Sequence, residues 1–406
     1  MKQKYALLAA FGLLVAGAGS SLVSSQAGTT IVIGGRDGVT DTGLVNDLIN
    51  KFLKPALAKD GIDVKYTPIG DYDKAIVNQL SAGTAPDVFY LPDNTAKGLV
   101  SSGKILPLNG LVSSADFISS LNQTYTFGGK LYGIVKDFNT LATYYNKDLF
   151  DQANVAYPND KDTWTTFSDK LAKVQKALGA GYYGTCFPAD YARFAAFAYG
   201  TGWKPTKKVT DPSFVRAFDF YTNLVKSKVA VQPSTISAGW GGDCIKSGKV
   251  ATAFEGAWAL GFLRDNAPNL QYGTSLIPLD PTTKRRGNLL FSVAWAINKG
   301  TKNTDAAVKV LNLLTSKAAQ EYVLENGLAL PSRKSLQTSP YFKKSGAEPQ
   351  ANNTVFRGAS SGNVVAFNQP PVFTDAINEA LKSVMDGTST SAEALQRAQG
   401  KIDQIK

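Results

Sequence analysis

The sequence predicts an α/β fold, in which mostly parallel strands alternate with helices. From residue 29 onward, short β-branched segments and amphipathic segments follow one another in the order strand, helix, strand, helix, strand. The composition, 44% apolar and 18% charged, is that of an ordinary folded protein. Because 406 residues are too many for one hydrophobic core of usual size, we expect about two or three domains.

The first elements follow from local patterns. TTIVIGG is a short strand that ends in glycines, and the next helix has an apolar stripe formed by Leu44, Leu48, Phe52 and Leu53. GIDVKYTPI then alternates as a strand, DYDKAIVNQLSAG is helical, and PDVFYLPD is again a strand. Since ligands bind beyond the carboxyl ends of parallel strands, Arg36, Asp37 and Asp93 are candidate ligand contacts.

A second region begins near residue 140 and is rich in aromatic side chains. The segment DTWTTFSDKLAKVQKALG is an amphipathic helix that either Asp162 or Thr163 caps. Further on, DPSFVRAFDFYTNLVKSK and NTDAAVKVLNLLTSKAAQEYVLENG are helical, while YGTSLIPL and LLFSVAWAIN are strand-like. A capping box at Thr390 and Glu393 predicts a final surface helix.

The N-terminus has the pattern of a secretory signal. Two lysines precede an apolar run from Tyr5 to Val15, and small residues lead to Ser25-Gln26-Ala27. A retained membrane anchor would also begin with an apolar run, but this run is shorter than the ~20 residues that a span needs, and no cysteine follows it. We therefore expect residues 1–27 to be cleaved and the mature protein to be exported, soluble and periplasmic or otherwise extracytoplasmic.

Residue usage excludes several kinds of chemistry. Histidine is absent, so neither a Ser-His-Asp triad nor an imidazole metal ligand is possible, and we expect no metal and no cofactor. The two cysteines, Cys186 and Cys244, suggest one disulfide in an oxidising compartment, although they could also be two buried thiols. The net charge of +11 is scattered, which favours solvated surface charge over nucleic-acid binding.

One apolar stretch, GKVATAFEGAWALGFL at residues 248–263, contains an acid and an indole. An ionised carboxylate is costly to bury unless it is hydrogen-bonded, so Glu255 requires partners. The neighbouring Trp258 is three residues away. The stretch therefore predicts either a ligand site or a structural ion pair.

Five segments match the pattern of one known family, in order and at family-like spacings. They are PDVFYLPDNTAKGLVSSGKILPL, GKLYGIVKDFNTLATYYNKDLFDQANV, DTWTTFSDKLAKV, GKVATAFEGAWALGFL and NGLALPSRKSL. Together they resemble the extracellular solute-binding proteins of carbohydrate ABC importers, in the maltose and multiple-sugar class. The resemblance implies a two-lobed, type II periplasmic-binding-protein fold. Each lobe would be a mixed, mostly parallel sheet flanked by helices, with the ligand cleft between the lobes.

The resemblance also implies how the chain is divided and what it does. Crossings are expected near residues 136–143, 291–296 and 329–333. One lobe would hold residues 28–139 plus 296–331, and the other 140–295 plus 332–406. The protein would not be an enzyme. As a monomer, it would bind a sugar, such as a maltose-type oligosaccharide, by lobe closure and deliver it to the membrane permease subunits of an ABC transporter.

Sugar chemistry indicates which side chains to expect in the cleft. Hydroxyls bond well to charged groups, and apolar C–H faces pack on aromatic rings. The expected ligand contacts are Arg36, Asp37, Asp93, Asp137, Phe138, Tyr191, Trp240, Glu255, Trp258, Trp295 and Arg333.

Most of these residues could instead have a purely structural role. Glu255 could cap a helix or pair with an arginine while Trp258 is core, and Asp137 could be an exposed loop charge. Trp240 could cover Cys244, whereas Trp295 could pack at the hinge. Arg333 could form a structural salt bridge, and Phe138 and Tyr191 could be core residues.

Two rival functions remain open on the sequence alone. A glycoside hydrolase needs only paired carboxylates, but the chain is not organised as an eight-fold βα barrel. A protein of the same architecture could instead bind a different solute, such as a polyamine, which would require carboxylates beneath aromatic rings. A structural surface protein would be expected to show repeats, and none is present.

Overall fold

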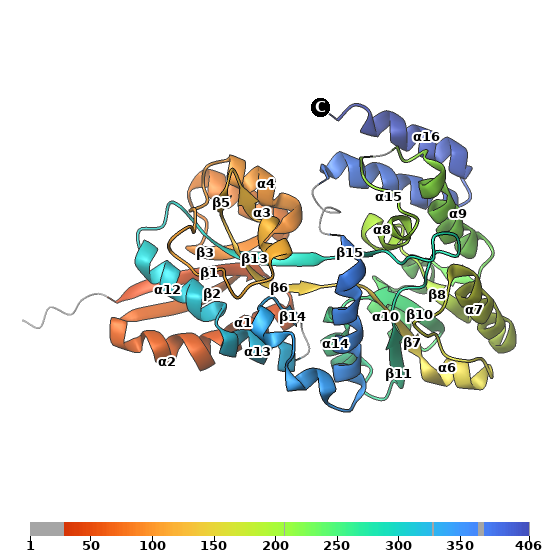
Figure 1. The fold of residues 1–406 in the computed structure, drawn as a ribbon, viewed down its shortest axis with the longest axis horizontal. Coiled ribbons are helices and arrows are strands. Elements are labelled where there is room, and N and C mark those ends of the chain that lie inside the picture. Colours follow the sequence, from red (N-terminus) through yellow and green to blue (C-terminus); the bar gives the residue numbers. More distant parts are fainter. Residues whose placement is uncertain (1–27, 207, 327–328, 364–368, 406) are drawn as a thin grey trace, which may run out of the picture.

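The computed structural model describes residues 28–206, 208–326, 329–363 and 369–405. The expected signal peptide and its cleavage site lie outside these residues. The molecule has two α/β lobes, and strands β6 and β13 lie towards the junction between them (Figure 1). The predicted α/β class with two lobes is confirmed.

The first lobe is built on a six-stranded mixed sheet. Its strands, in spatial order, are β14 (Leu330–Pro331), β6 (Ile134–Asn139), β13 (Phe291–Ile297), β3 (Val88–Pro92), β1 (Thr29–Arg36) and β2 (Ile62–Ile69). Strand β1 is parallel to β2 and β3, whereas β13 is antiparallel to β3 and β6. Every residue of β3 is buried, as expected for a central strand.

Helices cover this sheet on both sides. They are α1 (Val39–Leu48), α2 (Lys54–Leu57), α3 (Tyr72–Ala82), α4 (Asp93–Ser101), α5 (Ser119–Gln123), α12 (Thr304–Leu314) and α13 (Lys317–Glu325). A π-helical turn, Ile49–Leu53, joins α1 to α2, and a small hairpin consists of β4 (Thr126–Phe127) and β5 (Lys130–Leu131). The long helix predicted at residues 303–327 is in fact α12 and α13, because the side chain of Ser316 accepts a hydrogen bond from the amide of Ala319 and caps a new helix.

The second lobe is built on a five-stranded mixed sheet. Its strands, in spatial order, are β11 (Tyr272–Ser275), β7 (Ala142–Asn146), β10 (Val250–Glu255), β8 (Tyr183–Cys186) and β9 (Ala230–Val231). Its helices are α6 (Lys147–Gln152), α7 (Trp164–Leu178), α8 (Tyr191–Gly200), α9 (Pro212–Lys226), α10 (Gly241–Lys246), α11 (Trp258–Asn266), α14 (Ala347–Gly358), α15 (Pro371–Met385) and α16 (Ser391–Ile402). A short parallel pair, β12 (Asn288–Leu289) and β15 (Gly362–Asn363), completes the strands.

Local sequence explains where these helices begin and which face they bury. Thr163, not Asp162, caps α7, and the helix buries Trp164, Phe167, Leu171 and Val174 at helical spacing. Asp162 instead pairs with Lys170. The capping box predicted at Thr390 and Glu393 is confirmed at the start of α16.

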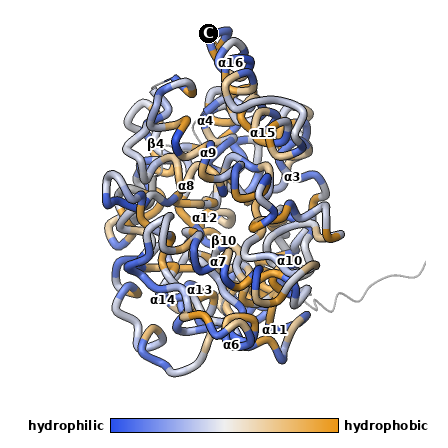
Figure 2. Tube along the Cα trace, turned by 90° about the vertical axis from the view of Figure 1, so that its right-hand side faces the viewer, coloured by the Kyte–Doolittle hydropathy of each residue, from blue (hydrophilic) through white to orange (hydrophobic). Residues whose placement is uncertain are grey.

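The buried apolar side chains form two clusters. The first cluster contains the sheet of the first lobe with α1, α3, α12 and α13, and it continues into the second lobe through β7, β10, α10 and α11. The second cluster is rich in aromatic rings and lies around α7, α8 and α9. Viewed from the side of the second lobe, hydrophobic segments lie in the interior around β10, whereas outer loops are hydrophilic (Figure 2).

The expected lobe boundaries differ from this placement of strands at two points. Residues 291–295, which we assigned to the second lobe, are paired with β6 and β3 in the first sheet. Likewise, Arg333 still contacts the first lobe, since its guanidinium bonds Asp116. The chain passes from the first sheet to the second between the end of β6 at Asn139 and the start of β7 at Ala142.

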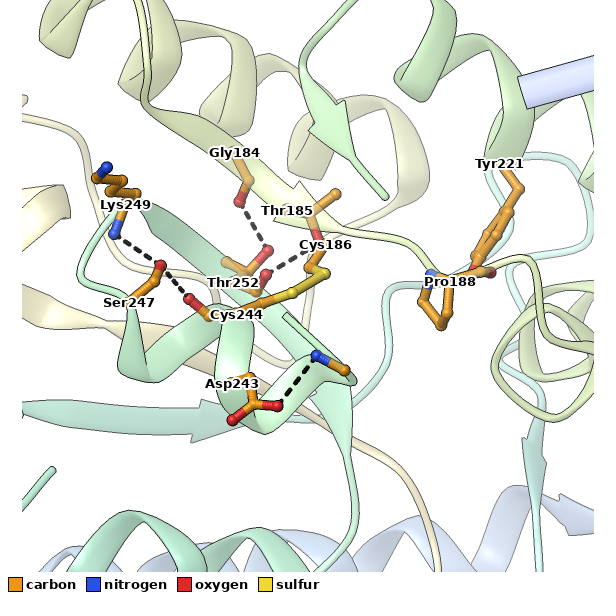
Figure 3. The surroundings of a disulfide bond; sticks show 11 residues. Gly184, Thr185, Cys186, Pro188, Tyr221, Asp243, Cys244, Ser247, Lys249 and Thr252 are labelled. Atoms are coloured by element: carbon orange, nitrogen blue, oxygen red, sulfur yellow. Dashed lines mark hydrogen bonds between the residues drawn. A yellow bond between two sulfur atoms is a disulfide. The ribbon is translucent and has the colours of Figure 1, made fainter. Parts of the chain in front are cut away.

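The predicted disulfide between Cys186 and Cys244 is confirmed, with a Cα–Cα distance of 6.3 Å. It joins the end of β8 to the middle of α10 (Figure 3). Around it, the Thr185 hydroxyl donates to the carbonyl of Thr252, and the Thr252 hydroxyl donates to the carbonyl of Gly184, which links β8 to β10. The Ser247 hydroxyl donates to the carbonyl of Cys244. The disulfide therefore holds the short helix α10 against the central strands of the second lobe.

Candidate functional site

A cavity of about 660 Å³ lies between the two lobes. The first lobe contributes all but one of the charged side chains that line it, namely Arg36, Asp41, Asp93, Lys136 and Asp137. The second lobe contributes one cation and three aromatic rings, namely Arg193, Trp240, Trp258 and Phe262. We call these two sides the ionic wall and the aromatic wall.

Asp93 is placed in the ionic wall by the junction of β3 and α4. It is the first residue of α4, and its carboxylate accepts hydrogen bonds from the amides of Asn94 at 2.8 Å and Ser292 at 3.2 Å. Burial raises the pKa of Asp93 to about 7, although these two amide hydrogen bonds oppose the shift. Asp93 is therefore a carboxyl group that can change its protonation state near neutral pH.

Lys136 and Asp137 face the cavity together because of an irregularity in β6. In the pairing with β13, Val293 lies opposite Asp137 and Ala294 lies opposite Val135, so Lys136 is an extra residue without a counterpart. Such a β-bulge breaks the alternation that would otherwise turn neighbouring side chains to opposite faces. Both side chains line the cavity and form an ion pair with each other.

Each member of this ion pair alters the pKa of the other. Burial alone would lower the pKa of the Lys136 ammonium, but Asp137 and Asp41 raise it above its usual range. Burial also raises the pKa of the Asp137 carboxyl, and Lys136 opposes that shift. The pair therefore contributes a compensated charge to the ionic wall.

The aromatic wall is held from behind by Glu255, at the end of β10. This side chain is only 2% exposed and does not line the cavity. Its Oε2 atom accepts hydrogen bonds from Arg193 at 2.7 Å and from the indole nitrogen of Trp258 at 2.8 Å. Burial raises the pKa of Glu255, and Arg193 opposes the shift. Glu255 thus pairs with an arginine, and this pairing leaves the ring of Trp258 towards the cavity.

Trp240 is placed by the glycine-rich segment that leads into α10. A Cβ atom at Gly241 would overlap the carboxylate of Glu255, and one at Gly242 would overlap the ring of Trp240 itself. The indole packs edge-on against Phe262, with ring centroids 4.8 Å apart. Gly242 is therefore needed for the ring of Trp240 to lie over α10, and Gly241 is needed for the backbone to approach Glu255.

Six residues predicted as ligand contacts do not line the cavity. Glu255 is one of them, and the others are Asp37, Phe138, Tyr191, Trp295 and Arg333. Asp37 is exposed just beyond β1. Phe138 is 2% exposed, because it follows Asp137 in the strand and points to the opposite, core side.

The remaining three have structural partners. Tyr191 is buried in the aromatic core of the second lobe, where its hydroxyl bonds that of Tyr199 at 3.0 Å. Trp295 packs behind the cavity against Tyr90, with ring centroids 4.6 Å apart. Arg333 forms an ion pair with Asp116 at 3.0 Å, so its observed role is a structural salt bridge.

The five predicted residues that do line the cavity are Arg36, Asp93, Asp137, Trp240 and Trp258. The sequence reasoning missed several others, among them Asp41, Tyr90, Lys136, Asn139, Arg193, Phe262 and Ser292. Phe262 had a signal, since it lies four residues after Trp258 and hence on the same face of α11. Nothing in the sequence signalled Arg193 beyond its place in an aromatic segment.

The described part of the chain has no candidate metal site, because no three cysteine, aspartate or glutamate side chains converge there in a way that could hold a metal ion. Among the same residues, no helix is both long and apolar enough to cross a membrane.

Comparisons with known proteins find relatives among binding proteins. A model of the bacterial extracellular solute-binding protein family matches residues 47–350. A binding protein of Brucella abortus is 26% identical over 344 residues, covering 81% of this chain and 82% of that protein. The galactooligosaccharide-binding protein of Bacillus subtilis is 25% identical, and the alignment covers 97% of this chain and 94% of that protein. The maltooligosaccharide ABC transporter solute-binding lipoprotein of Streptococcus pneumoniae is 28% identical over 65% of this chain and 63% of its own length.

Solved structures share the fold at low sequence identity. An ABC substrate-binding protein from Listeria monocytogenes, in complex with cycloalternan, has a TM-score of 0.81 at 23% identity, covering 93% of this chain and 98% of that one. The GacH receptor of Streptomyces glaucescens, solved unliganded and with acarbose, also has a TM-score of 0.81, at 21% identity, covering 93% of this chain and 100% of that one.

Proposed function

The chain belongs to the bacterial extracellular solute-binding proteins, and from this premise we propose that it captures a saccharide outside the cytoplasmic membrane and delivers it to an ABC importer. Relatives named for binding maltooligosaccharide and galactooligosaccharide support the carbohydrate class. The same family membership supports a binding role without catalysis. Export with loss of residues 1–27 and action as a monomer are parts of the proposal.

The observation that carries this proposal is the division of the cavity between the lobes. Hydroxyl groups would bond to the ionic wall through Asp93, Asp137 and Arg36, because charged groups make the stronger hydrogen bonds. The apolar faces of the pyranose rings would pack on Trp240 and Trp258 of the aromatic wall. A saccharide offers both kinds of surface at once, whereas a purely apolar or purely ionic ligand would use only one wall.

The two-walled arrangement also gives the mechanism. A ligand that contacts both walls gains its full set of contacts only when the lobes are closed, so binding shifts the population towards the closed form. The crossing between β6 and β7, at residues 140–141, is one place where such a motion can be absorbed. The closed form would then dock on the permease subunits.

The roles of individual residues follow from this geometry. We assign direct ligand contact to the five predicted residues that line the cavity, and add Asp41, Lys136 and Arg193. Glu255 would act through the orientation of Trp258 and Arg193 rather than by touching the ligand. No role in ligand contact is proposed for Tyr191 or Arg333.

A thermal-shift screen against mono- and oligosaccharides, with spermidine and phosphate as non-sugar solutes, tests the proposal. A solute that binds only the native state raises the apparent melting temperature by mass action. We expect at least one saccharide to give a clear shift. A shift with spermidine or phosphate and with no saccharide would refute the substrate class, and released reducing ends would show a hydrolase instead.

A further inference from the structure

The charges that line the cavity are not evenly compensated. All three cations already have an acidic partner. Arg36 lies 3.4 Å from Asp73, and Lys136 pairs with Asp137. Arg193 bonds Glu255 at 2.7 Å and Asp190 at 2.9 Å.

Two of the three acids have no such partner. Asp41 accepts a hydrogen bond from the hydroxyl of Tyr90 at 3.0 Å, and Asp93 accepts two from backbone amides. Within the described residues, no lysine or arginine nitrogen lies at salt-bridge distance from either carboxylate. The ionic wall therefore offers two carboxylates whose only hydrogen-bond donors are neutral groups.

This imbalance has a physical consequence for the ligand. A half-buried carboxylate loses solvation that a neutral hydroxyl replaces only in part, whereas a cation restores it through a charge-assisted hydrogen bond. With a neutral saccharide in a closing cleft, Asp41 would have only the longer-range attraction of Lys136. The ionised form of Asp93 would have only that of Arg36. A ligand with a positive charge would compensate at least one of the two carboxylates.

We propose, on the basis of the function proposed above, that the saccharide taken by this cleft carries a protonated amino group, which Asp41 and Asp93 bind. The ligand class is then an amino sugar with a free amine rather than a neutral or acetylated sugar. The three compensated cations remain available as hydrogen-bond donors to its hydroxyls.

The protonation of Asp93 gives the proposal an independent signature. Burial raises the pKa of Asp93 to about 7, so part of the empty protein is protonated there at neutral pH. An ammonium group beside it lowers that pKa, because an opposite charge favours the ionised form. At a pH low enough for the sugar amine to be fully protonated before it binds, binding of an amino sugar therefore releases a proton from Asp93, whereas binding of a neutral sugar has no comparable reason to do so.

Calorimetric titration with matched ligands tests this. The pairs differ in an amine against a hydroxyl: glucosamine and glucose, galactosamine and galactose, and the tetrasaccharide of glucosamine and cellotetraose. We expect one amino sugar to bind at least tenfold more tightly than its partner, with a binding enthalpy that changes with the ionisation enthalpy of the buffer. Asp41→Asn and Asp93→Asn should each reduce the preference to within about threefold, whereas Asp63→Asn, an exposed substitution on β2, should leave it unchanged.

The outcomes separate this inference from the function on which it rests. If a neutral sugar binds as tightly as its amino counterpart, or if no amino sugar in the panel binds, the inference is wrong. The proposed saccharide function still stands in either case if a neutral sugar binds. If spermidine binds and no saccharide does, the proposed function itself is wrong. The buffer dependence is measured on the wild-type protein, so it remains decisive even where a variant fails to fold.

Discussion

Removal of the Glu255 carboxylate should destabilise the second lobe strongly. Glu255 is 2% exposed and is hydrogen-bonded to Arg193 and Trp258. Removing one partner of a buried ion pair lowers the free energy of unfolding by about 3–5 kcal/mol, because the other charge is left uncompensated. Arg193 keeps Asp190 at 2.9 Å, which places Glu255→Ala at the lower end, so we expect a loss of about 3 kcal/mol.

Urea unfolding of three variants measures this. Glu255→Gln keeps one acceptor oxygen for the indole of Trp258 and should lose less, about 1–2 kcal/mol. The matched control is Glu379→Ala, which breaks an exposed pair with Lys401 and should stay within about 0.5 kcal/mol of wild type. If Glu255→Ala is no more destabilising than Glu379→Ala, then Glu255 does not hold the aromatic wall and the reasoning fails.

Three further predictions concern pH, the disulfide and Arg333. The folded-state pKa of Asp93, about 7, lies above that of an unfolded aspartate, so the contribution of Asp93 to stability is present below about pH 4 and is lost as the pH rises towards 7. The free energy of unfolding of Asp93→Asn should therefore exceed that of wild type by about 1–2 kcal/mol at pH 8 and equal it at pH 4. Equal gains at both pH values would contradict the assignment. Replacing Cys186 and Cys244 by serine should lower the free energy of unfolding by about 4 kcal/mol, from the 58-residue separation. It should also weaken saccharide binding several-fold, because Trp240 directly precedes α10. Unchanged affinity would show that the disulfide does not position the ring. Arg333→Ala should lower stability by about 1 kcal/mol and leave saccharide affinity within twofold, because the partner of Arg333 is Asp116 and not the ligand. A tenfold loss of affinity would show that Arg333 contacts the ligand.

How far the sequence could predict the site depends on the kind of contact. Asp93 was found because it directly follows a strand whose carboxyl end had to face the cleft, and Trp258 because an indole stood beside a buried acid. Local pattern was enough in these two cases. Phe138, predicted only as an aromatic side chain suited to a sugar, does not line the cavity, since strand alternation turns it away from the side that Asp137 faces.

Other features of the site arise only from pairing between distant segments. The bulge that brings Lys136 to the cavity is a matter of register between β6 and β13, which are separated by about 150 residues in the chain. Arg193 and Glu255 are 62 residues apart, and nothing in either local segment indicates their ion pair. The α/β class, by contrast, could be read from the alternation of short segments, because each of those elements is determined locally.

The central claim is that one saccharide is held between the ionic wall of the first lobe and the aromatic wall of the second. Calorimetric titration of the saccharide with the largest thermal shift, on Asp93→Ala and Trp258→Ala, tests it most directly. We predict that each variant, one from each wall, loses at least tenfold in affinity while remaining folded. Wild-type affinity in either variant would mean that the ligand does not bridge the two lobes, and the account would be wrong.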